Sequence, residues 1–112
     1  MGNSLRPTSI TAFLDGLPLV FQRGRSAGLN ATYHFTFLGS ERVEATVVIR
    51  DERLEVLEGH QGHADFRLTA DAPTWLGFLA KERNLAWALL RRKIRFKGSP
   101  RLLLAFGRCF PT

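Results

Sequence analysis

The chain has 112 residues, which is enough for one hydrophobic core and too few for two. Its single cysteine, Cys109, excludes an internal disulfide, and no stretch of about 18 apolar residues or basic leader indicates a membrane span or a secretion signal. We therefore expect one cytoplasmic domain over residues 1–112. The net charge of +6 is unevenly placed, because residues 81–112 hold nine Lys and Arg against Glu82 alone.

The first half of the chain predicts a helix followed by an antiparallel meander. Thr8 or Ser9 can cap a helix that begins near Ile10, and Pro18 predicts a kink or an early end of it. Apolar and polar residues then alternate in three runs, which is typical of strands with one buried face. These runs are residues 31–38, 43–50 and 53–58.

The second half predicts a fourth strand, two helices, a fifth strand and a last helix. The helix starts are marked by residues that commonly cap helices, and two of them are followed by a proline in the first turn. These caps are Asp71, Asn84 and Ser99, and the two strands are residues 66–70 and 93–97. The element order predicts an α+β fold: a five-stranded, mainly antiparallel sheet covered on one face by helices.

Five motifs follow one another along the chain: residues 27–33 (AGLNATY), the hairpin at 47–58, Gly59, residues 64–71 (ADFRLTAD) followed by Trp75-Leu76, and residues 88–98 (ALLRRKIRFKG) before a leucine-rich last helix. In this order and at this spacing they resemble the sterol carrier protein 2 (SCP-2) domain family. The resemblance covers about residues 10–110. It implies a sheet covered by helices, with an apolar tunnel between them that holds a fatty acid, an acyl chain or a sterol-like lipid.

The chain departs from the family pattern in two places. Asp51-Glu52 stands where the family usually has a glycine, which leaves open a wider turn in this hairpin. The chain ends in Cys-Phe-Pro-Thr, without the Ser-Lys-Leu type of ending that peroxisomal members carry. Peroxisomal import is therefore not expected.

The apolar side chains of the strands and of the last three helices are the predicted ligand contacts. From the pattern alone they either fill a core or line a cavity, and the resemblance favours a cavity lined by part of them. An empty space of about 300 Å³ would cost on the order of 7 kcal/mol, so a tunnel here should be filled or collapsed. The predicted contacts are Phe35, Phe37, Phe66, Trp75, Phe78, Leu79, Trp87, Leu90, Phe96, Leu103, Phe106 and Phe110.

A run of basic residues before the last helix is interpreted as a contact with anionic head groups or with an anionic membrane surface. The run contains Arg91, Arg92, Lys93, Arg95 and Lys97. A solvated face that keeps the domain soluble is the alternative. Nucleic acid is not an expected partner, because the neighbouring aromatic residues alternate inward and leave no stacking surface.

No pattern predicts a catalytic group, a cofactor or a metal site. His60 and His63 lie in a glycine-containing loop without a nearby cysteine, and His34 is remote in sequence. The carboxylates of the hairpin region belong to a charged, solvated edge. We predict a non-enzymatic domain that binds or transfers a hydrophobic ligand. The alternative is an accessory domain that forms a homodimer or presents hydrophobic substrate to a partner enzyme.

Overall fold

The computed structural model describes residues 8–80 and 85–110. In chain order the elements are α1 (Ile10–Val20), the 3₁₀ helix η1 (Arg23–Ser26), β1 (Ala31–Leu38), β2 (Val43–Arg50), β3 (Arg53–Glu58), β4 (Phe66–Asp71), α2 (Ala72–Leu79), α3 (Leu85–Leu90), β5 (Ile94–Lys97) and α4 (Pro100–Cys109). This order confirms the predicted α+β fold. Among the described helices, none has the length and apolar character needed to cross a bilayer.

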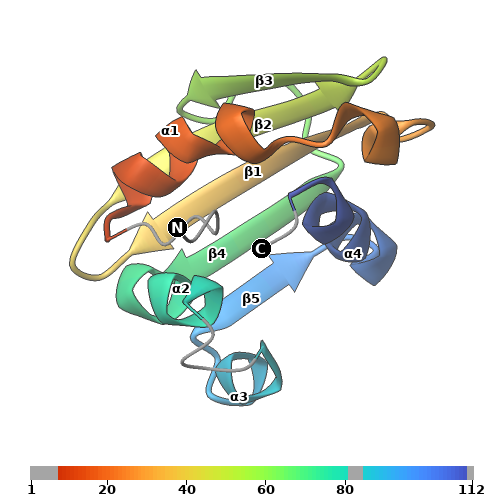
Figure 1. Cartoon of the computed structure of the whole chain (residues 1–112). Coiled ribbons are helices and arrows are strands. Elements are labelled where there is room, and N and C mark those ends of the chain that lie inside the picture. Colours follow the sequence, from red (N-terminus) through yellow and green to blue (C-terminus); the bar gives the residue numbers. More distant parts are fainter. Residues whose placement is uncertain (1–7, 81–84, 111–112) are drawn as a thin grey trace.

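The five strands form one sheet in the order β3-β2-β1-β4-β5. Three of the four pairings are antiparallel, and β1 with β4 is the parallel pair. α1, α2 and α4 lie on one face of the sheet, and α3 lies beside the β5 edge (Figure 1). The sheet therefore has one covered face and one open face, as the sequence predicted.

Strand register decides which side chains meet on the covered face. Tyr33 pairs with Phe66, Phe35 with Leu68 and Phe37 with Ala70 across the parallel β1–β4 ladder. These six side chains are at most 1% exposed. Because side chains alternate along a strand, the residues between them, such as His34 and Thr36, point to the open face.

α1 ends at Val20, two residues after Pro18, which was expected to kink it or to end it early. Ser9 caps its start, since its Oγ accepts a hydrogen bond of 3.1 Å from the Ala12 amide. Pro18 lies in the last turn, where its missing N–H removes one helical hydrogen bond. Phe13 and Leu17 are buried against the sheet. Val20, the last residue of the helix, also packs against the core.

The predicted caps of α2 and α4 are confirmed. Asp71 Oδ2 accepts hydrogen bonds from the Thr74 amide at 3.2 Å and from the Thr74 hydroxyl at 2.7 Å. Ser99 Oγ accepts one from the Arg101 amide at 3.2 Å. Both helices carry a proline in their first turn, where no hydrogen bond is lost. The third expected cap, Asn84, lies outside the described residues.

The turn between β2 and β3 is tight, so the wider turn that the sequence left open is not formed. Arg50 and Arg53 pair directly, and only Asp51 and Glu52 connect them. Both of these residues have positive φ angles, 53° and 59°, which favour Gly or Asn. The Asp51 amide donates to Asn30 Oδ1 at 3.3 Å, and the Arg23 Nε–H donates to the Glu52 carbonyl at 3.1 Å.

Replacing Glu52 by glycine should stabilise the protein. A left-handed residue other than glycine costs about 1–2 kcal/mol, and part of the gain is lost to the greater freedom of glycine in the unfolded chain. We expect Glu52→Gly to raise the free energy of unfolding by about 0.5–1 kcal/mol, measured by urea denaturation. Glu52→Ala is the control, because it removes the carboxylate and keeps the strained conformation. Equal effects of the two variants would contradict the backbone argument.

Candidate functional site

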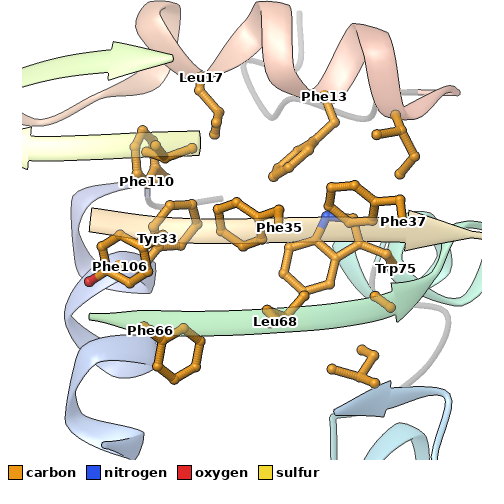
Figure 2. Close-up of a cluster of buried hydrophobic side chains, with 14 of the residues drawn as sticks. Phe13, Leu17, Tyr33, Phe35, Phe37, Phe66, Leu68, Trp75, Phe106 and Phe110 are labelled. Carbon is orange, nitrogen blue, oxygen red and sulfur yellow. The ribbon is translucent and has the colours of Figure 1, made fainter. Parts of the chain in front are cut away.

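The covered face of the sheet carries a row of aromatic rings on its central strand. Tyr33, Phe35 and Phe37 come from alternate positions of β1 and are buried. Their neighbouring rings stack with centroid separations of 6.2 Å and 5.9 Å. The row runs along the strand beneath the helices (Figure 2).

Three helices place further rings against this row. Phe13 of α1 meets Phe37 edge to face, with a centroid separation of 6.1 Å. Trp75 of α2 lies 5.8 Å from Phe37 and 5.6 Å from Phe13. Phe106 of α4 lies 5.2 Å from Tyr33. α1, α2 and α4 are therefore held over the sheet by ring contacts.

Tyr33 also ties α4 to the sheet through its hydroxyl, which donates a hydrogen bond of 2.7 Å to the Leu102 carbonyl. Burial raises the pKa of Tyr33 well above its ordinary value, with the charges of Cys109 and Asp65 adding to the rise. The hydroxyl therefore stays a donor at every physiological pH. Tyr33 was missed as a candidate contact, although its alternation with Phe35 and Phe37 carried the signal.

Cys109, the last residue of the same helix, is fully buried. Burial raises the pKa of its thiol, and nearby Arg108 opposes the rise. The Cys109 carbonyl accepts a hydrogen bond of 2.8 Å from the Gln22 amide, which joins the end of α4 to the segment after α1. These features indicate a structural role for Cys109.

The structure brings together eleven of the twelve predicted contacts. Six are buried in the core, and five are half-buried and packed against it. The buried ones are Phe35, Phe37, Phe66, Trp75, Phe106 and Phe110, and the half-buried ones are Phe78, Leu79, Trp87, Phe96 and Leu103. Leu90 is the exception and requires a correction, because 82% of its surface is exposed at the end of α3. A six-residue helix beside the sheet edge turns only part of its surface to the core.

Half-buried apolar residues pack against the core at several places, including α1, β2 and β3, and seven of them gather on one side. These seven come from α2, α3, β5 and α4, the four elements that lie around the β5 edge (Figure 1). Phe78 packs 5.6 Å from Trp75, and Phe96 stacks 5.5 Å from Phe66. We call this set the apolar rim: Leu76, Phe78, Leu79, Trp87, Phe96, Leu102 and Leu103.

One buried polar atom of the core has no partner among the described residues. Trp75 is 2% exposed, and its indole Nε1 makes no hydrogen bond there. Figure 2 shows this nitrogen within the ring layer. A buried donor without an acceptor costs about 1–3 kcal/mol.

The basic run is divided between two places. Arg95 and Lys97 pair with residues of β4 and point to the open face. Arg91, Arg92 and Lys93 form the exposed turn between α3 and β5, next to Leu90. The Arg91 guanidinium lies 5.9 Å from the centre of the Trp87 ring, so this turn borders the apolar rim.

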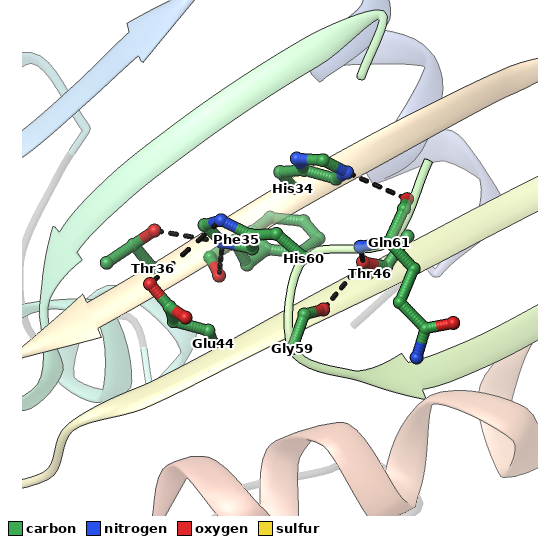
Figure 3. Close-up of polar contacts among 8 residues, drawn as sticks. All are labelled: His34, Phe35, Thr36, Glu44, Thr46, Gly59, His60 and Gln61. Carbon is green, nitrogen blue, oxygen red and sulfur yellow. Dashed lines mark hydrogen bonds and ion pairs between the residues drawn. The ribbon is translucent and has the colours of Figure 1, made fainter. Parts of the chain in front are cut away.

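The histidines on the open face serve to hold a loop. The rings of His34 and His60 stack with a centroid separation of 4.7 Å, and His34 Nε2 lies 3.0 Å from the Gln61 carbonyl (Figure 3). His60 Nε2 lies 3.0 Å from the Phe35 carbonyl, and its Nδ1 lies 4.0 Å from Glu44. In the ranges 8–80 and 85–110, no group of three or more His, Cys, Asp or Glu side chains is placed to hold a metal ion.

These features agree with the family comparison. The model of the SCP-2 sterol transfer family matches residues 20–111. The chain belongs to this family. No curated protein sequence matches the chain.

Solved structures share the fold at low sequence identity. Sterol carrier protein 2 from Yarrowia lipolytica, in its apo form, matches with a TM-score of 0.70 and 15% identity over 97% of this chain and 99% of that one. Palmitated SCP2L2 from Aedes aegypti matches with a TM-score of 0.62 and 17% identity over 88% and 89%. The sec-alkylsulfatase Pisa1 from Pseudomonas sp. matches with a TM-score of 0.79 and 19% identity over 100% of this chain. The chain spans only 17% of that sulfatase.

Removing the Tyr33 hydroxyl should loosen α4. We expect Tyr33→Phe to lower the free energy of unfolding by about 1 kcal/mol, the usual net value of such a hydrogen bond. The measurement is urea denaturation together with amide hydrogen exchange, in which the amides of α4 should exchange faster than those of β2. Unchanged exchange in α4 would contradict the anchoring role.

Proposed function

We propose that this SCP-2 family domain, taken as one unit over residues 1–112, binds a fatty acid, an acyl chain or a sterol-like lipid between its sheet and α2, α3 and α4, and carries it without catalysis. The observation that supports this most directly is the apolar rim. Its large side chains are neither buried in the core nor freely exposed, and they come from four elements around one edge. Such a surface suits the entry of an apolar ligand. A cytoplasmic location is part of the proposal.

Two further observations support a lipid of amphipathic type. Membership of the SCP-2 family supports lipid binding in general, and a relative of the same fold was solved as a palmitated protein. The unpartnered Trp75 Nε1 would gain a hydrogen bond from an oxygen atom of such a ligand. We therefore infer a ligand with a long apolar part and at least one acceptor.

The energetics favour a carrier over a tight binder. Burial of about 12 methylene groups contributes about 10 kcal/mol, at about 0.8 kcal/mol each. Association costs about 4–15 kcal/mol, so the net affinity should be modest and should increase with chain length. Modest affinity allows the ligand to be released to a membrane or to a partner.

The α3–β5 turn is proposed as the membrane contact. It combines the exposed Leu90 with the cations Arg91, Arg92 and Lys93. Each cation near an anionic bilayer contributes about 1 kcal/mol, and a leucine that enters the acyl layer adds apolar burial. Arg95 and Lys97, which point to the open face, are not required for this contact.

An accessory role is the second candidate. The match to a sec-alkylsulfatase, of which this chain spans 17%, favours it, because there the fold forms part of a larger enzyme. In this role the domain would form a homodimer or present hydrophobic substrate to an enzyme. A native mass spectrum separates the two candidates, since a carrier retains lipid and an assembly domain appears as an empty dimer.

Blocking the apolar rim should reduce lipid retention. We expect Leu103→Trp to lower the lipid extracted from the purified full chain, because the half-buried Leu103 faces the proposed ligand space. The matched control is Leu104→Trp on the same helix, where the side chain is 65% exposed and added volume meets solvent. The measurements are mass spectrometry of organic extracts and uptake of a fluorescent fatty acid.

One outcome of this experiment would contradict lipid binding itself, and another would contradict only the proposed position of the ligand beside Leu103. One is an extract of the unaltered protein that matches the buffer blank, with no uptake of the fluorescent fatty acid at tens of micromolar. The other is a large loss of thermal stability in Leu103→Trp with unchanged uptake, since overpacking a filled core costs about 1–3 kcal/mol. The second result would assign the side chain to a solid core.

A negative charge at the α3–β5 turn should impair membrane docking. We expect Leu90→Glu to weaken sedimentation with anionic vesicles, because it adds repulsion and removes apolar burial. Leu19→Glu on α1 is the matched control, because Leu19 is 83% exposed and Leu90 is 82% exposed. Both variants should bind neutral vesicles weakly. An equal loss in both would show that net charge alone governs binding and would remove the docking role from this turn.

A further inference from the structure

The open face of the sheet carries a cluster of cations that the function above does not use. The register places His34, Arg67 and Lys97 in one row across β1, β4 and β5, and Thr36, Thr69 and Arg95 in the next row. Arg67, Arg95 and Lys97 are exposed. A groove of about 730 Å³ runs over these two rows, and all six residues line it.

The cations of this groove face each other without compensation. Arg67 and Lys97 are direct partners across the antiparallel β4–β5 pair, and Arg95 lies on the same face two residues from Lys97. Like charges at directly opposed positions destabilise a sheet. In the described part of the chain, no carboxylate forms an ion pair with any of these three side chains.

The described carboxylates nearby are engaged elsewhere. Asp65 accepts a hydrogen bond of 2.8 Å from the Thr32 amide, and Asp71 caps α2. Glu44 is on the open face, but it lies beside His60 at 4.0 Å, on the far side of β1 (Figure 3). The groove is therefore an electropositive concavity with hydroxyl groups at its base.

We propose that this groove binds a small, water-soluble anion that carries phosphoryl groups with two or three negative charges, such as a diphosphate. The three cations match that charge. An arginine guanidinium binds a phosphoryl group through two parallel hydrogen bonds, and Lys97 adds a point charge. The Thr69 and Thr36 hydroxyls line the same groove and can donate to further phosphoryl oxygens.

Other anionic partners fit this face less well. Binding of single-stranded nucleic acid usually uses aromatic rings on which bases stack. Phe96 borders the groove, but its ring stacks on Phe66 at 5.5 Å, and the rings of His34 and His60 stack on each other. A bilayer would meet a hollow whose exposed side chains are cationic, with no exposed leucine of the kind found at the α3–β5 turn.

The test uses the full chain with pyrophosphate as the probe, at constant ionic strength. Binding is followed by calorimetry and by the shifts of backbone amide resonances in β4 and β5. The test variant is a double variant that carries both Arg67→Gln and Lys97→Gln. The control is Arg50→Gln with Arg53→Gln, which removes another directly opposed pair of cations and changes the net charge equally. Asp51 and Glu55 line one surface pocket together with that control pair, so the control site also contains carboxylates.

We expect the test variant to weaken pyrophosphate binding about tenfold or more, and the control to change it by less than about twofold. Without ligand, the test variant should melt about 1–5 °C higher than the unaltered protein, because the repulsion is relieved. Equal losses in the two variants, or no binding of pyrophosphate by the unaltered protein, would overturn the proposal. The proposal would also be overturned if the protein bound only to vesicles that carry phosphate monoester head groups, and if that binding depended on the groove cations. Lipid retention on the covered face is measured separately and does not depend on this site.

Discussion

The arrangement of this domain depends on the burial of one row of rings on the central strand. Tyr33, Phe35 and Phe37 contact rings from α1, α2 and α4, which are far apart in the sequence. Each fully buried ring contributes about 2–3 kcal/mol, whereas a helix cap contributes about 1 kcal/mol. The helices are short, and their positions over the sheet are therefore set by these contacts more than by their own helical stability.

Local sequence patterns predicted most of the fold, because strand alternation and helix caps depend on residues that are close together in the sequence. The two-residue alternation in residues 31–38 fixes which side chains of β1 are buried, and the caps Asp71 and Ser99 fix where α2 and α4 begin. The parallel pairing of β1 with β4 depends on contacts between distant segments and left no local signal. Leu90 was misplaced for a related reason, since helical spacing does not show how much of a six-residue helix the core covers.

The cation cluster on the open face could not be predicted from the sequence for the same reason, because it also depends on contacts between distant segments. The basic run at residues 91–97 was visible as a unit, yet a reversal of direction within it separates Arg91 and Arg92 from Arg95 and Lys97. Arg67 joins the last two only because β4 pairs with β5. No single strand contains this cluster, so the groove could be found only after strand pairing was known.

The sheet also separates apolar side chains from cationic side chains, and a carrier of an anionic lipid must combine the two. Apolar side chains lie on one face and the groove cations on the other, so Arg67 and Lys97 do not face a lipid held between sheet and helices. The α3–β5 turn is different, because Arg91 lies against Trp87 of the apolar rim. Under the proposed function, an anionic head group at the rim would therefore meet Arg91 and its neighbours. Ligand entry and membrane contact would then occur at the same edge of the molecule.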